Sequence, residues 1–469
     1  MVLKIRLTGR VIFKGEPGYE QARLNWNPYV DTFPLVFVFA QSTKDVTNAI
    51  KWARMNNVPI RVRSGRHALD KNLSIVKDGI VIDVSDMKKV QLIREKEVAI
   101  VQTGINVGPL VKKLAQEGFM VPFGDSPTVG IGGITLGGGM GLLQRSIGFI
   151  SDNLIGLEMV DANGTVLKAN KNNNSDLLWA SRGGGGGNFG INTEYRFKVH
   201  HAPAEATVFE IIWPWNQLEK VFKAWQKWAP FVDNRLGSIL DIFSKNNGLL
   251  HATGLFLGSK TKLTSLLEPL TSVGTPTKVF IQELPYPNVV EHLIPDEPIP
   301  GRADRNYKFS SAWATCLFPD EAIKIMRSFL EESTGTESSF FFLNCGGAVS
   351  RISSEATAFF WRSPKFYLEW NTTWTQDSEA SRNLALVART HQQLNPFVEG
   401  AYVNSPDQNI INFGPAYYGT NFDRLQRIKA KYDPENVFHF PQSIPLNFKY
   451  IFCIYHFLCI QISRIVSRK

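Results

Sequence analysis

The chain has 469 residues, of which 43% are hydrophobic and 20% charged, so it is long enough for about two or three domains with substantial cores. This composition excludes disorder, collagen and coiled coil as descriptions of the whole chain. The formal net charge of +9 is mild for this length and is not gathered in a basic block, so nucleic-acid binding is not expected.

The start of the chain and its cysteines indicate where the protein resides. The first twenty residues carry charges every few positions and contain no apolar core of a signal peptide. The spacing of the four cysteines is not that of a disulfide framework. We therefore expect an intracellular protein in a reducing environment.

Residues 447–469 form an atypical apolar and basic tail. Its uncharged run is shorter than the ~20 residues that a membrane-spanning helix needs. Cys453, His456 and Cys459 lie in this tail without a nearby fourth ligand, so no metal site is expected. A packed or disordered tail, or an extension unrelated to the fold, is favoured over a membrane-surface anchor.

Helix and strand patterns alternate over the first 200 residues. Apolar residues on one face predict a helix at 42–57, with Ser42 as its cap and Asp45 at the capping-box position. The next elements are expected in the order strands at 59–62, 79–84 and 98–102, a helix from 107, a hairpin of 154–160 with 165–167, and a strand at 189–199. This mixture predicts an α+β fold.

Glycine is concentrated in two runs, at residues 124–141 and 183–187. Backbone without side chains can approach a ligand closely and adopt positive φ. Both runs lie among strands, which favours loops that cradle a ligand over a flexible linker. The context of Gly130–Gly133 fits the dinucleotide fingerprint poorly, and the sequence has no P-loop or nucleophile-elbow motif.

The composition changes after about residue 205, where glycine runs end and aromatic residues become frequent. Periodicity predicts helices near 218–228, 319–331, 378–394 and 419–431, and strands at 339–343, 366–370 and 401–404. We expect a second domain, in which helices cover an antiparallel sheet. The basic residues of 424–431 are expected to face solvent.

His67 is the one histidine before residue 200, and it ends the run Arg61-Val-Arg-Ser-Gly-Arg-His. Successive N–H groups in such a turn can form an anion nest for a pyrophosphate, to which Arg63 and Arg66 could add charge. A histidine at the edge of this nest, beside a flavin ring, would be a nucleophile. Taken alone, however, a histidine in a surface loop is the better explanation.

Five motifs in a fixed order change that interpretation. They are RVRSGRH at 61–67, SPTVGIGGITLGGGMG at 126–141 followed by GFISDNL at 148–154, DLLWASRGGGGGNFGI at 176–191, AYVN at 401–404, and YYGTNFDRLQRIKAKYDPENVFHFPQSIP at 417–445. In this order they resemble the covalent FAD-linked oxidases of the vanillyl-alcohol oxidase fold, in the berberine-bridge-enzyme-like branch. The resemblance covers roughly residues 30–446.

The resemblance implies a fold and a cofactor. Residues 1–203 would be a two-subdomain FAD-binding domain of the PCMH type, 204–416 a substrate-binding domain with a helix-covered antiparallel sheet, and 417–446 a segment that returns to the FAD-binding domain. His67 would be bonded covalently to the flavin 8α-methyl carbon. The other implied FAD-binding residues are Arg63, Ser64, Gly65, Arg66, Ser126, Thr128, Gly132, Gly133, Gly137, Gly138, Asp152, Asn153, Gly190, Ile191, Asn404 and Asn436, with Gln442 as a further candidate.

Three positions depart from the family pattern. Ser126 stands where bicovalent members have cysteine, and serine is a far poorer nucleophile, so a single covalent bond through His67 is expected. Arg66 occupies a position that is usually glycine, where a side chain crowds the loop. Ile134 stands where histidine is common.

Two residues are candidates for catalysis. Glu369 matches a family position whose carboxylate acts as general base in some plant members, and burial near flavin would raise its pKa; the alternative is a carboxylate that faces solvent or pairs with a basic residue. Tyr402 is expected to share a strand face with Asn404 and to orient or deprotonate a substrate hydroxyl, although packing would explain it as well. Arg362 is expected to form a structural ion pair.

The predicted function is that of an FAD-dependent oxidase with two partners, a small-molecule substrate and molecular oxygen. It would take a hydride from an alcohol, a sugar hemiacetal or an alkaloid- or polyketide-like donor and reduce oxygen to hydrogen peroxide. One alternative is a dehydrogenase of the same fold with another electron acceptor. Another is a flavin-binding structural protein, for example of a spore coat. No specific protein partner is predicted.

Overall fold

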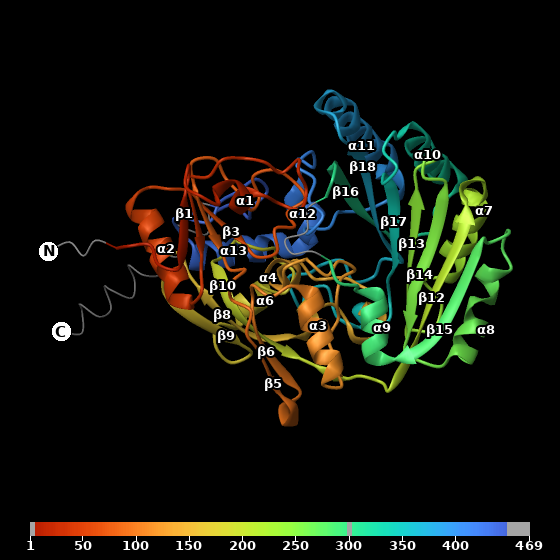
Figure 1. Cartoon of the computed structure of the whole chain (residues 1–469), viewed down its shortest axis with the longest axis horizontal. Helices are drawn as coiled ribbons and strands as arrows, with labels where there is room; N and C mark the ends of the chain where they lie inside the picture. The colour runs from red at the N-terminus through yellow and green to blue at the C-terminus, as the bar shows by residue number, and fades with distance from the viewer. Residues whose placement is uncertain (1–4, 298–302, 448–469) are drawn as a thin grey trace.

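The protein is described here from a computed structural model, over residues 5–297 and 303–447. Two lobes lie side by side in Figure 1. The first lobe is built from the N-terminal part of the chain, in red to yellow, together with the C-terminal segment, in blue. The second lobe is built from the middle of the chain, in green to teal, around a large sheet.

The first lobe contains a four-stranded sheet at its N-terminal side. Its strand order is β1 (Arg10–Phe13), β2 (Val36–Phe39), β4 (Ile80–Asp83) and β3 (Ile60–Arg63), and the pairs β2–β4 and β4–β3 are parallel. Every residue of β2 and β4 is buried, as expected for strands covered on both faces. Helices α1 (Tyr19–Arg23) and α2 (Thr43–Met55) belong to this subdomain.

Helix α2 confirms the predicted helix, but its predicted capping box does not form. The Ser42 hydroxyl makes no bond to the helix backbone and instead donates to Asp45 Oδ2 at 2.9 Å. Asp45 Oδ2 also accepts from the backbone N–H of Gln41 at 3.1 Å. The aspartate therefore satisfies the groups before the helix, because a carboxylate is the stronger acceptor.

A second, antiparallel sheet completes the first lobe. Its order is β5 (Val90–Ile93), β6 (Val98–Gln102), β10 (Ile191–Lys198), β8 (Leu154–Val160) and β9 (Val166–Asn170). The predicted strand at 98–102 and the β8–β9 hairpin are confirmed. The remaining elements before residue 203 are α3 (Val107–Gln116), β7 (Phe119–Met120), α4 (Ile131–Leu136), α5 (Gln144–Ile147), α6 (Ser175–Ala180) and β11 (His200–His201).

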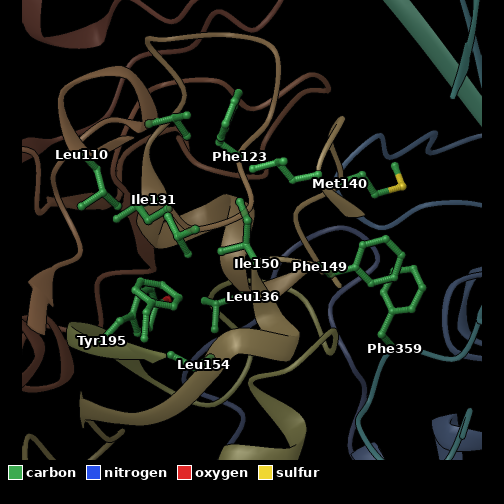
Figure 2. Close-up of a cluster of buried hydrophobic side chains, with 14 of the residues drawn as sticks. Leu110, Phe123, Ile131, Leu136, Met140, Phe149, Ile150, Leu154, Tyr195 and Phe359 are labelled. Carbon is green, nitrogen blue, oxygen red and sulfur yellow. The ribbon is translucent and has the colours of Figure 1, made fainter. Parts of the chain in front are cut away.

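A hydrophobic cluster anchors the glycine-rich helix α4 in this lobe. Ile131 and Leu136 of α4 point into the cluster formed with Leu154 of β8 and Tyr195 of β10 (Figure 2). The hydroxyl of Tyr195, which is fully buried, donates to the carbonyl of Gly132 at 2.8 Å. The apolar side chains thus hold α4 from one side, while Gly132 and Gly133 line a cavity on another side.

The second lobe is a seven-stranded antiparallel sheet covered on one face by helices (Figure 1). Its strand order is β15 (Lys278–Pro285), β12 (Glu205–Pro214), β14 (Leu249–Phe256), β13 (Leu236–Phe243), β17 (Ser339–Asn344), β18 (Phe366–Trp374) and β16 (Asn306–Ala314). The covering helices are α7 (Leu218–Trp228), α8 (Lys260–Thr271), α10 (Asp320–Glu332) and α11 (Ala380–Leu394). Helix α9 (Tyr286–Leu293) packs against α3 of the first lobe.

Side chains of β18 alternate between the two faces of this sheet. Phe366, Leu368 and Trp370 belong to the core beneath the helices. Tyr367 and Glu369 point the other way, towards the first lobe, and line a cavity there. The predicted α+β architecture is therefore confirmed, with the antiparallel sheet presenting its uncovered face to the first lobe.

The chain ends by returning to the first lobe through α12 (Phe413–Tyr418) and α13 (Phe422–Tyr432) (Figure 1). Helix α13 confirms the predicted helix, but the expectation that its basic residues all face solvent was wrong for Lys429. Its fully buried ammonium donates to Asp433 Oδ2 at 2.7 Å and to the carbonyls of Asn188 at 2.8 Å and Phe438 at 2.6 Å. Three acceptors offset the loss of water and tie α13 to the second glycine run.

Residues 448–469 of the predicted tail 447–469, which include Cys453, His456 and Cys459, lie outside the described residues. Within residues 5–297 and 303–447, no helix has the length and apolar character needed to cross a bilayer.

Candidate active site

A cavity of about 790 Å³ lies between the two lobes. This volume is in the upper part of the range of ~300–1,000 Å³ typical of small-molecule sites. The first lobe supplies the loop 61–67 and parts of both glycine runs, and the second lobe supplies Phe341 and Glu369 from the uncovered face of its sheet. The loop 402–406 closes another side. All five sequence motifs therefore reach or support one cavity.

The predicted site residues divide into two groups. Those that line the cavity are Arg63, Ser64, Gly65, Arg66, His67, Ser126, Gly132, Gly133, Gly190, Ile191, Glu369, Tyr402, Asn404 and Gln442. Those that do not line it are Thr128, Gly137, Gly138, Asp152, Asn153 and Asn436.

Two glycines bring the first two motifs into direct backbone contact. A Cβ atom on Gly65 would lie 2.0 Å from the nitrogen of Gly130, and one on Gly130 would lie 2.3 Å from the nitrogen of Gly65. Neither position can carry a side chain without moving a backbone segment. The absence of side chains here lets the His67 loop lie directly against the first glycine run.

Gly137 and Gly138 have a packing role and do not face the cavity. A Cβ atom on Gly137 would lie 2.1 Å from Asn404 Oδ1, and one on Gly138 would lie 2.9 Å from the Phe359 ring. Both glycines make room for side chains that arrive from the second half of the chain. They thus support Asn404 and Phe359, and their expected direct contact with the cofactor stays a prediction.

His67 is held on two sides. Its Nε2 lies 2.8 Å from the hydroxyl oxygen of Thr128, and its ring stacks on Trp26 with a centroid distance of 5.4 Å and an interplanar angle of 20°. Burial lowers the pKa of His67 to about 4, so the imidazole is neutral at neutral pH. Thr128 thus acts on the site through His67, and the neutral imidazole lines a cavity that can hold a ligand.

Two of the three arginines in the first motif, Arg63 and Arg66, are less available to an anion than the sequence indicated. Arg63 Nε pairs with Asp83 Oδ2 at 2.7 Å, and both side chains are almost fully buried. Arg66 Nε lies 3.8 Å from the same carboxylate, and burial lowers the pKa of Arg66 to about 10. Asp83 therefore neutralises much of the charge that was expected to bind pyrophosphate.

Arg66 also has a positive φ of 65°. This left-handed conformation favours glycine, since a Cβ atom costs roughly 1–2 kcal/mol there. The structure thus explains why glycine is usual at this position and how arginine occupies it, by turning its side chain towards Asp83 and the ring of Phe39.

Asp152 and Asn153 maintain the loop after the first glycine run, and neither lines the cavity. Arg362 binds both oxygens of Asp152 at 2.8 Å, and the side chains are 2% and 5% exposed, which confirms the expected structural role of Arg362. Asn153 donates to the carbonyls of Ile147 and Phe149. The polar side-chain groups of Asp152 and Asn153 are thus engaged within the protein, and their expected cofactor contacts stay a prediction.

Asn436, whose expected contact with the cofactor stays a prediction, lies in a turn outside the cavity lining, and its Oδ1 is buried without a hydrogen-bond partner among the described residues. It has a φ of 54°, and its carbonyl accepts a hydrogen bond from His439 Nδ1 at 3.0 Å. Asparagine is one of the residues that tolerate this left-handed conformation.

The carboxyl group of Glu369 is the centre of a polar network in the cavity. The Tyr367 hydroxyl donates to Glu369 Oε2 at 2.8 Å and lies 2.9 Å from Ser405 Oγ. Burial raises the pKa of Glu369 to about 7, although the hydrogen bonds from Ser405 and Tyr367 oppose the rise. A carboxyl group that titrates near neutral pH is suited to accept a proton.

Tyr402 lies in the cavity wall, but it is not on a strand as predicted. The backbone N–H of Tyr402 donates to the side chain of Ser311 at 3.0 Å, so no strand partner is present there. The Tyr402 hydroxyl oxygen accepts from the N–H of Gly139 at 2.9 Å and from Asn404 Nδ2 at 2.9 Å. With burial raising its pKa to about 12, this hydroxyl keeps its proton and is suited to orient a ligand as a donor.

Two further carboxylates were missed in the sequence. Asp125 lines the cavity, and the surrounding protein raises its pKa. Asp241 on β13 lies opposite Phe341, which in turn lies opposite Glu369 on β18, and burial raises the pKa of Asp241 to about 8 with contributions from Asp125 and Glu369. A charged residue inside the apolar strand 236–243 was the available signal for Asp241.

The cavity residues fit FAD on structural grounds. Backbone of Gly132, Gly133 and 185–187 lines the wall, where it can approach a dinucleotide closely. Asn192 also lines the cavity, and its Oδ1 is buried without a hydrogen-bond partner among the described residues. Such an orphaned acceptor indicates a donor group on a bound ligand. Over the described parts of the chain, no group of three or more His, Cys, Asp or Glu side chains could hold a metal ion.

Comparisons with known proteins agree with this geometry. Residues 34–170 match the FAD binding domain family and residues 401–445 match the family described as berberine and berberine like. YvdP of Bacillus subtilis, an uncharacterized FAD-linked oxidoreductase, is 67% identical over 440 residues, with 94% of this chain and 98% of the relative covered. Reticuline oxidase of Papaver somniferum is 29% identical, with 89% and 84% covered. The solved structure of Physcomitrella patens BBE-like 1 matches with a TM-score of 0.86 at 30% identity, with 94% and 98% covered.

The chain belongs to the berberine bridge enzyme-like family of FAD-linked oxidoreductases. This confirms the resemblance inferred from the five motifs. The protein is thus an FAD-linked oxidoreductase that acts on small molecules, and its first lobe is an FAD-binding domain of the PCMH type.

Proposed function

We propose that the protein is an oxidase that holds FAD by one covalent bond to His67 and oxidises an alcohol, a sugar hemiacetal or an alkaloid- or polyketide-like donor. The observation that carries this proposal is the shared cavity: a neutral histidine on the first lobe and a carboxyl group with a pKa of about 7 on the second lobe line the same space. The proposed domain division is 1–203, 204–416 and 417–446, with 447–469 as the tail.

The covalent bond rests on the state of His67. With FAD bound, the lone pair of one imidazole nitrogen would form the bond to the 8α-carbon, the ring would lose its N–H proton from the other nitrogen, the methyl group would lose one proton, and dioxygen would take up the electron pair released. The Thr128 hydroxyl oxygen lies 2.8 Å from His67 Nε2, and within the described residues His67 Nδ1 has no hydrogen-bond partner. Ser126 lines the cavity but is a weak nucleophile, which supports a single bond.

Glu369 is the proposed general base of substrate oxidation. FAD, when bound, supplies the acceptor for the hydride that leaves the donor carbon. Glu369 takes the proton from the donor hydroxyl or amine, and Tyr367 and Ser405 keep its carboxyl group in place. Tyr402 donates a hydrogen bond to the substrate, since Gly139 and Asn404 already donate to its oxygen.

Dioxygen is the proposed final acceptor. It takes an electron pair and two protons per donor oxidised and leaves as hydrogen peroxide. The name reticuline oxidase, given to the Papaver relative, supports an oxidase in this family. A dehydrogenase would reduce an added dye with the same donor and would consume no oxygen.

The proposed FAD contacts are the cavity-lining residues of the first lobe and of the loop 402–406. They are Ser64, Gly65, Arg66, Ser126, Gly132, Gly133, Gly190, Ile191 and Asn404. Arg63, Thr128, Gly137 and Gly138 act indirectly, by holding the loops and side chains that reach the cofactor.

Acid precipitation of the purified protein tests the proposal. We expect the yellow colour to stay with the pellet, and His67→Ala to release it to the supernatant. Ser126→Ala is the matched control, and it should keep the colour in the pellet. Colour retained by His67→Ala would contradict the proposed bond, and the absence of oxygen uptake with every donor that bleaches the flavin would contradict the oxidase.

A further inference from the structure

The loop that follows His67 is docked on the free edge of the sheet in the second lobe. Strand β16 is the edge strand, whose outer backbone groups have no strand partner along most of its length. At Tyr307 the buried side chain of Asn27 stands in for a neighbouring strand. Asn27 Oδ1 accepts from the N–H of Tyr307 at 3.0 Å, and Asn27 Nδ2 donates to the carbonyl of Tyr307 at 2.9 Å. The same Nδ2 donates to the carbonyl of Leu69 at 3.1 Å.

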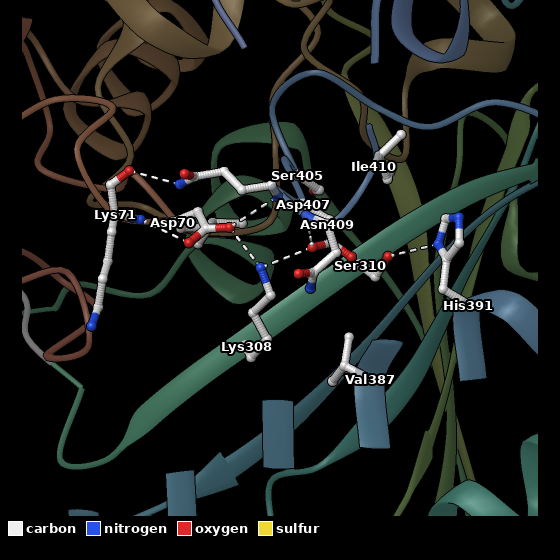
Figure 3. Close-up of polar contacts among 12 residues, drawn as sticks. Asp70, Lys71, Lys308, Ser310, Val387, His391, Ser405, Asp407, Asn409 and Ile410 are labelled. Carbon is white, nitrogen blue, oxygen red and sulfur yellow. Dashed lines mark hydrogen bonds and ion pairs between the residues drawn. The ribbon is translucent and has the colours of Figure 1, made fainter. Parts of the chain in front are cut away.

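Lys308, the next residue on β16, makes a second and ionic connection to this loop (Figure 3). Its Nζ lies 2.6 Å from Asp70 Oδ2 and 2.9 Å from Asp407 Oδ1. None of the three side chains is more than 6% exposed. Asp70 follows His67 by three residues, and Asp407 follows Asn404 by three residues, so one ammonium joins both loops of the cavity to the sheet.

Backbone contacts extend the connection between the two loops. Asp70 Oδ2 also accepts from the N–H of Gln408 at 3.2 Å, and Gln408 Nε2 donates to the carbonyl of Lys71 at 2.7 Å. Figure 3 shows these contacts meeting at the edge of β16, with Asp70 and Asp407 on either side of the Lys308 ammonium. The loops are therefore positioned against each other as well as against the sheet.

Trp26 carries this placement to the imidazole itself. Its ring stacks on His67 and lies 5.0 Å from the ring of Tyr307. Trp26 and Asn27 are adjacent in sequence, so one short segment contacts the imidazole, the loop after it and the edge strand. The segment that stacks on His67 is thus itself held by contacts with the edge strand of the second lobe, at the Tyr307 ring and backbone.

We propose that Lys308, together with Asn27, is a positioning residue for His67 and makes covalent attachment of FAD depend on correct docking of the second lobe. The inference rests on the proposed function, since it concerns the bond between His67 and the flavin 8α-carbon. That bond forms with the losses of protons and the transfer of an electron pair to dioxygen described above. Lys308 does not line the cavity, and it acts on His67 through its ion pair with Asp70, which is three residues after His67 in the same loop.

The size of the effect follows from the geometry of bond formation. Reacting atoms must approach to about 3–3.5 Å with aligned orbitals, and a misplacement of about 1 Å costs roughly a hundredfold in rate. Loss of the ammonium leaves two buried carboxylates without a counter-charge, so the loop carrying Asp70 is expected to move. We expect attachment to slow by at least about tenfold.

The test measures the rate at which acid-stable flavin forms after FAD is added to purified full-length protein. Lys308→Met is the main variant, and Asp70→Asn keeps the Lys308–Asp407 pair and serves if Lys308→Met does not fold. Gln226→Ala is the matched control. The buried Gln226 amide pairs with both backbone groups of Phe318, as the Asn27 amide does with Tyr307, but it lies on the helix side of the sheet. The melting temperature is measured for each variant.

We expect Lys308→Met to bind FAD but to form acid-stable flavin at least about tenfold more slowly, and Asp70→Asn to be slowed in the same direction. Lys308→Arg should recover most of the rate, and Gln226→Ala should melt earlier yet react like the unaltered protein. An unaltered rate in Lys308→Met, or in Asp70→Asn where only that variant folds, would overturn the inference alone. If the unaltered protein itself releases its flavin in acid, the covalent bond and this inference both fall.

Discussion

Replacement of Glu369 tests the catalytic half of the site. We expect Glu369→Gln to keep the shape of the side chain and its contact with Tyr367, but to remove the proton acceptor. A positioned general base contributes roughly 10²–10⁴-fold to a proton-coupled step. Anaerobic reduction of the flavin by a donor found in a substrate panel should therefore slow by about a hundredfold or more.

The pH profile gives this prediction its sign. Glu369 accepts a proton only when it is ionised, and its pKa is raised to about 7. The rate of flavin reduction should rise with pH through about 7 and level off above it, whereas Glu369→Gln should lose this limb. The rise and the residual rate can both be read by stopped-flow absorbance across the neutral range.

Tyr367→Phe provides a matched second variant. Tyr367 donates to Glu369 Oε2 at 2.8 Å, and this bond favours the ionised carboxylate. A hydrogen bond to a charged group is worth about 1.5–3 kcal/mol, and about 1.4 kcal/mol corresponds to one pKa unit. We expect Tyr367→Phe to move the rising limb by about one unit or more to higher pH. A normal rate in Glu369→Gln, or a limb that stays in place in Tyr367→Phe, would refute the assignment.

Three further predictions concern stability. Burial raises the pKa of Asp241 from 3.8 to about 8, so between these pH values the folded state holds a proton that the unfolded state releases, and stability falls as pH rises. Asp241→Asn should therefore raise the melting temperature more above pH 8 than near pH 4. An equal change in melting temperature at the two pH values would contradict the burial argument. Gly65→Ala should destabilise the fold by about 1–3 kcal/mol and abolish flavin binding, because its Cβ would lie 2.0 Å from Gly130 N. Gly133→Ala is the control, because no atom lies within 4 Å of its Cβ, and it should leave the denaturant midpoint unchanged or higher. Lys429→Met should lower the free energy of unfolding in urea by roughly 3–5 kcal/mol, because its buried ammonium is paired with Asp433. Lys431→Met, which removes an exposed ion pair, should lower it by about 1 kcal/mol or less. Similar losses in the two variants would contradict the burial of the Lys429 ammonium.

The sequence predicted those parts of the fold and site that depend on local pattern. Strands such as 98–102 and 154–160 and the helix at 218–228 follow from periodicity, and the structure has them at these positions. The glycine motifs and the histidine at 67 are also local signals, because close backbone approach requires glycine over several consecutive positions.

The remaining features depend on contacts between distant residues, which no local pattern contains. Asp152 lies in the motif that follows the first glycine run, which contains residues that line the cavity. Its ion-pair partner Arg362 is more than 200 residues away in the sequence, so the motif alone does not reveal the pair. The stretch at 401–404 has the composition of a strand, yet its backbone bonds to the side chain of Ser311.

Cross-strand register explains why one of the two missed carboxylates, Asp241, was not predicted. Asp241 meets Glu369 across Phe341 only because β13, β17 and β18 are neighbours in the sheet, and the sequence order of these strands does not show this. The Lys308 cluster likewise joins three segments that are far apart in the chain.

The central claim is that His67 carries the flavin. Trypsin cleaves after Arg66 and Lys71, so digestion of the purified protein releases the short peptide His67–Lys71. Mass spectrometry of this peptide should show the added mass of the flavin, with the fragment ions placing it on the histidine. An unmodified peptide from protein that is still yellow after acid treatment, or a flavin found on another peptide, would contradict the claim.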